Sequence, residues 1–372
     1  MEDFMKKIVG AVLASVLCGS ALFAYNPPAG AQNVLRLTEP QLLTGANSAA
    51  GGGIFGATPA SIINNPALTA WEQRSTLDLA GTLFVNSNTD YANFDNTLGG
   101  SFQGGLLIPS RWCVSTLLVQ GIWTDFFAMP VGNSFNFTGG LSKDITDQVS
   151  VGMTANFGLL YGDAVNSDWT LSAAFGAYYN YGDLFFMKNL RFGVSMSNIG
   201  KMYSGGSKTL GIESVKNFKD EKYEDMSDGT SWPGIATIRT GIAASFLKTD
   251  VMELGSSLDF SVPAFQNFVM DLGLQIQLWD FLKISSAWEF DVREFANDAK
   301  NLIPSIGVSF KFIFSSKEGS YMANKGWAQS DMTVSGAYRN LYKDVNAVSA
   351  GALLNLGMAD TKAPEVIMWD GE

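Results

Sequence analysis

The feature that most constrains this chain is a repeated two-residue alternation of apolar and small side chains. In SIGVSFKFIFS, residues 305–315, isoleucine, valine and phenylalanine alternate with serine, glycine and lysine. Successive side chains of a β-strand point to opposite faces, so such a segment has one apolar face and one face of small residues. The same pattern occurs in 75–85, 149–159 and 270–278. It predicts an all-β protein built from amphipathic strands.

The length and the second face of these segments indicate a membrane protein. They run for about 10–15 residues, whereas strands of globular proteins have about 5–6, and this length crosses a bilayer at a tilt. The second face carries Gly, Ser, Ala and Thr, where a water-exposed sheet would carry many Lys and Glu. A transmembrane β-barrel with protein inside its lumen needs such a face. The charges expected to face the lumen and anchor its contents are Asp78, Arg239, Asp271, Glu289 and Lys311.

Counting the alternating segments gives about 14 strands, an even number as bacterial barrels of this class require, although a count of about 12 stays open. Composition agrees, since charged residues make up only 16% of the chain, mean hydropathy is +0.10 and there are 39 glycines. The predicted strands are 75–86, 100–109, 112–124, 133–143, 147–161, 168–181, 188–199, 233–247, 250–262, 266–278, 281–293, 302–315, 330–341 and 346–358.

The first residues predict export from the cytoplasm. Lys6 and Lys7 precede the apolar stretch 8–23, and Ala24 offers a small residue for cleavage, so 1–24 has the form of a secretory signal peptide. An uncleaved membrane anchor and a lipoprotein processed at Cys18 are the alternatives. We therefore expect a mature chain that begins at residue 25 and lies in the outer membrane of a bacterial cell.

Charge and residue usage exclude several function classes. The formal net charge is −11, so the phosphate backbone of a nucleic acid is not an expected partner. The chain has no histidine, which removes His-based catalytic triads and His-ligated zinc. Cys113 is the one cysteine after residue 24, so no intramolecular disulfide forms. We expect no enzyme, no catalytic residue, no metal site and no cofactor.

Residues 25–74 do not alternate and are rich in glycine and turn-forming residues. They still hold too many leucines and isoleucines for a solvated leader, which is the alternative interpretation. Inside a barrel, this segment would bury those side chains and close the lumen. Pro66 fixes the local backbone, while Asn64 and Asn65 supply amides for buried backbone groups that would otherwise lack partners. We interpret 25–74 as a hatch, 75–358 as the barrel and 359–372 as a tail.

The chain resembles a known family at this junction. Asn65, Pro66 and Ala67, placed directly before a barrel of about 14 strands, resemble the FadL-type outer-membrane transporters of long-chain fatty acids. The likeness is closer to the PorV-like branch and a related spirochaete branch, in which a strand has the form Gly-x-x-x-x-Asn-hydrophobic-Gly. Here Gly193, Asn198 and Gly200 match that form, with Ile199 at the hydrophobic position.

The resemblance implies a hatch that blocks the lumen and shifts when a hydrophobic ligand arrives. It also implies a sideways exit near a kinked third strand, where Gly121 would permit the kink. Two departures concern the substrate: the chain is shorter than typical FadL proteins, and only 201–230 is long enough to form an external ligand groove.

Four functional interpretations follow. The first is a passive transporter for hydrophobic small molecules such as long-chain fatty acids, with membrane lipids and this ligand as its partners. The second is a PorV-like barrel for protein secretion, assembly or surface contact, in which 201–230 would bind a periplasmic or surface protein. A soluble secreted β-protein or carboxylate enzyme, and an unplugged porin, are the remaining two. Each interpretation has its own test. Co-purified fatty acid would support the transporter, and a stable protein partner would support the PorV-like barrel. Solubility without detergent would support the soluble protein, and a steady open conductance would support the porin.

Overall fold

The computed structural model describes residues 34–86, 98–124, 132–162, 167–203, 235–292, 295, 302–324, 329–341 and 345–357, apart from residues 46 and 266. The predicted signal peptide, the tail 359–372 and most of 201–230 lie outside these ranges. Among the described residues, no helix combines the length and the apolarity needed to cross a membrane.

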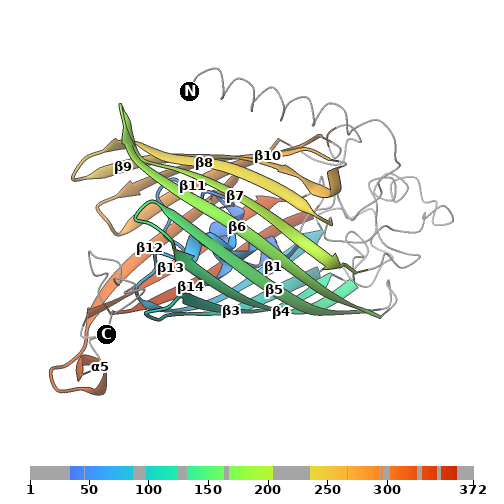
Figure 1. Cartoon of the computed structure of the whole chain (residues 1–372), viewed down its shortest axis with the longest axis horizontal. Helices are drawn as coiled ribbons and strands as arrows, with labels where there is room; N and C mark the ends of the chain where they lie inside the picture. The colour runs from blue at the N-terminus through green and yellow to red at the C-terminus, as the bar shows by residue number, and fades with distance from the viewer. Residues whose placement is uncertain are drawn as a thin grey trace, which may run out of the picture.

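Fourteen antiparallel strands form one closed barrel, in which each strand pairs with its neighbours in the sequence and β1 pairs with β14 (Figure 1). The predicted barrel and its strand count are confirmed, and the count of about 12 is excluded. The strands are β1 (Ser75–Asn86), β2 (Leu98–Pro109), β3 (Val114–Thr124), β4 (Gly132–Asp144), β5 (Val149–Tyr161), β6 (Asp168–Leu184), β7 (Met187–Lys201), β8 (Thr237–Lys248), β9 (Met252–Val262), β10 (Val269–Leu278), β11 (Leu282–Asp291), β12 (Ser305–Ser315), β13 (Gln329–Asn340) and β14 (Val345–Leu356).

The two faces of the wall follow the predicted alternation. In β1, Leu77, Leu79 and Leu83 are exposed on the outside, whereas Asp78 and Thr82 are buried inside. Comparable outward rows of Leu, Val, Ile and Phe occur on the other strands. An apolar outer band with small polar residues inside is the arrangement of a transmembrane barrel, since lipid covers the outside.

The two ends of the barrel differ. At one end, here called the turn end, short connections join β2 to β3, β4 to β5, β6 to β7, β8 to β9 and β10 to β11. The connection between β12 and β13 is also at the turn end but is long, and it contains the short helix α5 (Tyr321–Asn324). The opposite end, the loop end, carries connections that are mostly longer, although β13 and β14 are joined by a short one. Short turns on the periplasmic side are the rule for such barrels, so β1 begins on that side.

Strand pairing is regular except in two parts of the wall. The β6–β7 ladder shifts register three times, and the β7–β8 and β8–β9 ladders shift once each. β11 pairs with β12 only from Leu282 to Ala287, although β11 continues to Asp291. The wall is therefore held by fewer backbone bonds at the loop end of β11.

The segment before β1 lies inside the barrel (blue in Figure 1) and forms only short helices. These are η2 (Val34–Thr38), α2 (Pro40–Leu43), η3 (Pro59–Ile63) and η4 (Pro66–Thr69), while η7 (Pro263–Phe265) lies between β9 and β10. Proline occupies an early position of α2, η3 and η4, where its fixed backbone angle starts a helical turn without losing a hydrogen bond. We call residues 34–74 the hatch.

Candidate functional site in the barrel lumen

The hatch fills the lumen and is itself largely buried. Leu42, Leu43 and Ile62 are each about as inaccessible as residues in a protein core. Because η2 contacts β1 to β3, α2 contacts β12 to β14, and η4 contacts β4 to β6, the hatch touches opposite sides of the wall. The lumen is thus occupied by the chain's own amino-terminal segment.

Residues Asn64 to Ala67 connect the hatch to the inner wall. The Asn65 side-chain amide donates to the carbonyl of Ala49 at 2.8 Å and to the carbonyl of Ala177 on β6 at 2.9 Å. Its side-chain oxygen accepts from the Ala67 amide at 3.0 Å and so caps η4, which Pro66 begins. The Asn64 carbonyl accepts from Ser195 on β7 at 2.6 Å. One buried asparagine therefore joins two parts of the hatch to the barrel.

Arg239 on β8 is the most deeply buried cation of the lumen. Its guanidinium lies 3.2 Å from the carboxylate of Asp259 on β9 and donates to the side-chain oxygen of Asn64 at 3.3 Å. Asp259 in turn accepts from the Ala49 amide at 2.9 Å and from the Ser48 hydroxyl at 3.2 Å. This ion pair is thus also a polar contact between wall and hatch.

A second polar group holds η2 against β1, β2 and β3. Gln103 donates to Asp78 at 2.5 Å and accepts from the Thr38 hydroxyl of the hatch at 2.6 Å. Gln120 on β3 donates to Thr38 at 2.6 Å and to the Leu35 carbonyl at 2.8 Å. Asp78 is therefore linked to Thr38 of the hatch through Gln103.

Four of the five predicted anchor charges, Arg239 and three others, form ion pairs with charged side chains of the wall. Asp271 lies 3.8 Å from Arg239, and Glu289 lies 2.6 Å from Arg339 of β13, beside the short part of the β11–β12 ladder. A cavity of about 10 Å³, the size of one water molecule, lies between these two acids and Leu42 and Leu43 of the hatch. Lys311 lies 3.9 Å from Asp331 at the turn end.

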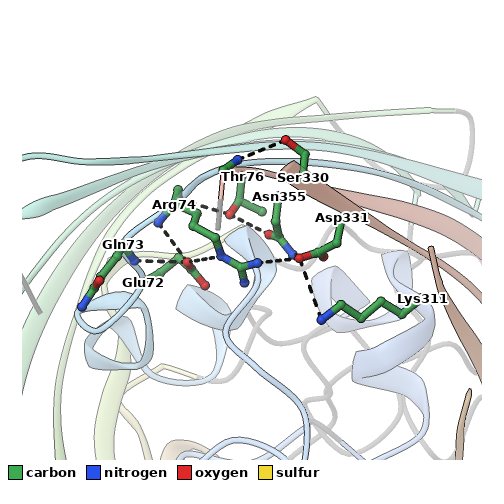
Figure 2. A network of polar contacts seen from close by, with 9 residues as sticks. Glu72, Gln73, Arg74, Thr76, Lys311, Ser330, Asp331 and Asn355 are labelled. Atoms are coloured by element: carbon green, nitrogen blue, oxygen red, sulfur yellow. Dashed lines mark hydrogen bonds and ion pairs between the residues drawn. The ribbon is translucent and has the colours of Figure 1, made fainter. Parts of the chain in front are cut away.

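Figure 2 shows the network around Asp331, where the hatch leaves the lumen. Arg74 donates to Asp331 of β13 at 2.6 Å and to Glu72 at 3.1 Å. Asn355 of β14 donates to Asp331 at 2.9 Å, and Lys311 approaches from β12. The last hatch residues are thereby fixed to three strands at the turn end.

The three residues of the predicted strand motif occupy specific positions on β7. Gly193 faces the hatch, where a Cβ would overlap the carbonyl of Ala49. Asn198 and Gly200 have positive φ angles of 61° and 144°, next to the register shift between β6 and β7. Gly193 therefore makes room for the hatch, while Asn198 and Gly200 allow an irregular strand end.

Gly121 lies in a regular part of the wall. Its register with β2 and β4 is continuous, and the ring of Phe102 covers it on the lipid side. The predicted sideways exit at this position stays a prediction.

Sequence reasoning missed several residues that hold the hatch. Arg191 donates to the carbonyls of Gly52 and Gly53, the latter at 2.8 Å. Gln275 accepts from the Gly53 amide at 2.6 Å and donates to the Gly45 carbonyl at 2.8 Å. The sequence contained one signal for them: Arg191 and Gln275 are long polar residues on strand faces that otherwise carry small residues.

The loop end of the lumen contains a buried apolar cluster. Val34, Leu35, Leu37 and Leu43 of the hatch pack there against inward-facing residues of the wall and the adjoining loops. We call these partners the apolar collar: Phe84, Ile122, Leu160, Tyr203, Ala337, Leu341, Val345 and Ala347. The middle of the lumen is polar by comparison, so the inner surface changes character along the barrel axis.

Glu39 provides a pH-dependent contact within the hatch. Burial raises the pKa of its carboxyl well above the ordinary value of 4.5, the nearby Asp78 carboxylate raises it further, and the Thr58 hydroxyl opposes the rise. The neutral form therefore stabilises the folded state fully below about pH 4.5, and this contribution is lost as the pH rises through the raised pKa.

The native barrel should become less resistant to heat as the pH rises above 4.5, because Glu39 becomes charged beside Asp78. We expect Glu39→Gln to show a smaller decrease, because an amide does not ionise. The measurement is the temperature at which the barrel loses its folded mobility in SDS gels, recorded across pH. Glu318→Gln, at an exposed site beyond β12, is the matched control and should follow the native curve. Parallel curves for Glu39→Gln and the native chain would contradict this assignment.

Among the described residues, no cluster of three or more Cys, Asp or Glu has the arrangement of a metal site. The closed wall, the apolar outer band and the occupied lumen instead define a plugged transmembrane β-barrel of the outer-membrane type.

Comparisons with known proteins give similar barrels of low sequence identity. The chain is similar to the crystal structure of a Pseudomonas aeruginosa FadL homologue, at 11% identity and a TM-score of 0.45 over 86% of this chain and 97% of that one. It is also similar to the CymD monoaromatic hydrocarbon channel, at 11% identity and a TM-score of 0.47 over 91% of this chain and 100% of that one. The crystal structure of the Pseudomonas putida toluene transporter TodX is similar at 10% identity and a TM-score of 0.45, over 84% of this chain and 98% of that one.

No family model and no curated protein sequence matches the chain. At these identities and TM-scores the similarities do not assign a family, so the proposals below depend on the contacts of this chain.

Proposed function

We propose that this protein is an outer-membrane channel for hydrophobic small molecules, with the hatch as its movable closure. The apolar collar is the observation that carries the proposal. A water-filled porin presents a polar lumen to its solutes. Here the inner surface at the loop end includes a cluster of Phe84, Ile122, Leu160 and their neighbours, packed against hatch residues of the same kind.

The collar favours an apolar ligand on energetic grounds. A hydrophobic molecule that replaces Val34 or Leu35 against Phe84 exchanges one apolar contact for another, at little cost. A polar solute would lose its hydration there without gaining hydrogen bonds, which costs about 1–3 kcal/mol for each unpaired group. Ligand sites are typically apolar surfaces with a few polar groups that fix orientation. In this lumen, Gln103 and Gln120 are buried polar residues of the wall, and their side chains are suited to fixing the orientation of a ligand.

The way the hatch is attached supports its movement. Each of the hydrogen bonds described above between hatch and wall, such as those of Asn65, Gln103 and Gln275, uses a side chain, and among the described residues the hatch adds no strand to the sheet. Such contacts break one at a time, whereas a paired strand separates as a unit. In this proposal a ligand in the collar displaces η2, while the other end of the hatch, which continues into β1, stays in place through the Arg74–Asp331 contact.

The substrate class is tested by uptake. Expression in a Gram-negative host that lacks its own outer-membrane fatty-acid transporter should restore uptake of radiolabelled oleate, with toluene tested in a separate arm. Long-chain fatty acid remains the predicted substrate, and the toluene arm distinguishes it from a small hydrocarbon. An intact folded barrel that takes up neither compound above the empty-vector level would overturn the proposal.

We expect Phe84→Asp to lower this uptake about tenfold or more, because a carboxylate in the collar opposes an apolar ligand by at least ~1.4 kcal/mol. Phe84→Leu, which keeps the site apolar, should retain most of the uptake. Rates are normalised to the heat-resistant folded barrel in the membrane fraction. Equal rates in the two variants would show that the collar is only packing for the hatch.

The protein-handling alternative depends on 201–230. Most of that loop lies outside the described residues, and no contact in the described part favours a periplasmic or surface partner. This alternative therefore stays a prediction.

A further inference from the structure

The β12–β13 hairpin extends beyond the turns of its neighbours at the turn end and carries α5 (Figure 1). On one side, β12 pairs with β13 through Ser315. On the other side, its ladder with β11 ends at Phe310, and one further bond joins the Lys311 amide to the Phe281 carbonyl at 2.7 Å. Residues 312–315 thus form a sheet edge.

The direction of the backbone groups on this edge follows from that last bond. Successive residues of a strand direct their amide and carbonyl groups to alternate edges. Since Lys311 bonds toward β11, Ile313 and Ser315 also direct theirs to that side. The described residues provide no backbone partner for them there.

The edge is also apolar and free of residues that discourage pairing. The exposed fractions of Phe312, Ile313 and Phe314 are 53%, 63% and 39%. Residues 312–315 contain no charge and no proline. An exposed, apolar, unblocked edge is a template for another strand.

We propose that residues 364–369 of this chain, PEVIMW, add to this edge as a further strand. The chain leaves β14 beside the same hairpin, because the Gly357 amide donates to the Ser330 hydroxyl of β13 at 3.1 Å. Residues 358–363 extend up to ~20 Å at about 3.3 Å each. Three strand spacings, the distance from β14 to a position outside β12, amount to about 14 Å.

The composition of the segment fits this role. Val366 and Ile367 are β-branched and favour strands, and Pro364 stands at the first position, where a strand tolerates proline. Residues 359–372 carry four acidic side chains, at 360, 365, 370 and 372, against the single Lys362. The hairpin offers the exposed Lys317 as a counter-charge, beside Lys311, which also lies 3.9 Å from Asp331.

The test is amide hydrogen exchange, residue by residue, on the folded barrel in detergent micelles. In the full chain, the amides of Ile313 and Ser315 should exchange at least about tenfold more slowly than in a chain that ends at Gly357. The amides of Phe312 and Phe314 point to β13 and should be equally protected in both, which gives an internal control. Adding a synthetic peptide of residues 359–372 to the shortened chain should restore the protection.

A matched pair of proline variants locates the contact. Ile367→Pro removes an amide inside the proposed strand and should abolish the protection of Ile313. Thr361→Pro changes the connecting residues and should leave it unchanged. Equal exchange at Ile313 and Ser315 in the full and shortened chains would overturn the proposal, and so would protection that appears only when another protein is added.

Discussion

Gly193→Leu is expected to displace the hatch and turn the closed barrel into an open pore. A Cβ at this position would overlap the carbonyl carbon and oxygen of Ala49 and the amide of Ala50. Backbone of the hatch cannot rotate away as the end of a side chain can, so the hatch must move. Overpacking of this kind costs about 1–3 kcal/mol, and it acts where Asn65 and Asp259 also bond Ala49.

The measurement is single-channel conductance in planar bilayers, supported by the sensitivity of cells to large antibiotics. Gly139→Leu is the matched control, because Gly139 faces outward with no atom near its Cβ position. It should conduct as little as the native protein. Gly152→Leu gives an independent second site, where the added side chain would overlap the backbone of Pro66 and Ala67. If both inward variants stay closed, the hatch does not close the lumen.

Arg239→Met should destabilise the protein by roughly 3–5 kcal/mol, since it leaves buried carboxylates without their counter-charge. Asp259 is fully buried 3.2 Å from Arg239, and Asp271 lies 3.8 Å away. The same change removes the donor to Asn64 of the hatch. The free energy of unfolding in urea, followed by tryptophan fluorescence in micelles, measures this loss.

Two further variants separate charge from packing. Arg239→Met combined with Asp259→Asn should recover part of the lost stability, because one unpaired charge disappears with its partner. Lys248→Met breaks an ion pair of similar length, 3.3 Å to Glu253, but at a lysine that is 64% exposed, and should cost at most about 1 kcal/mol. A small effect for Arg239→Met would show that this cluster contributes little to the fold.

The sequence was most informative where structure depends on neighbours along the chain. The two-residue period placed Leu77, Leu79 and Leu83 outside and Asp78 inside, as the structure has them. It also located all the strands to within a few residues. This succeeds because the direction of a side chain in a strand is set by position parity, and because lipid outside and protein inside select different residues for the two faces.

The partners inside the lumen could not be obtained in this way. Arg239 was recognised as a lumen charge, but its contacts with Asp259, Asn47 and Asn64 join three separate parts of the chain. Asn65 was singled out beside Pro66, yet its acceptors, the carbonyls of Ala49 and Ala177, lie 16 and 112 residues away. Local pattern has no information about which distant backbone group will be adjacent.

The sequence by itself therefore determined an amphipathic, lipid-facing set of strands and an apolar segment before them that needed a place to be buried. Only the tertiary structure decided the register in which β1 and β14 close the wall, which inner glycines admit the hatch, and which polar groups bond it. The physical reason is the range of the interactions. Alternation and turn formation act over a few residues, whereas closure and hatch docking depend on hydrogen bonds between residues that meet only after the barrel has formed.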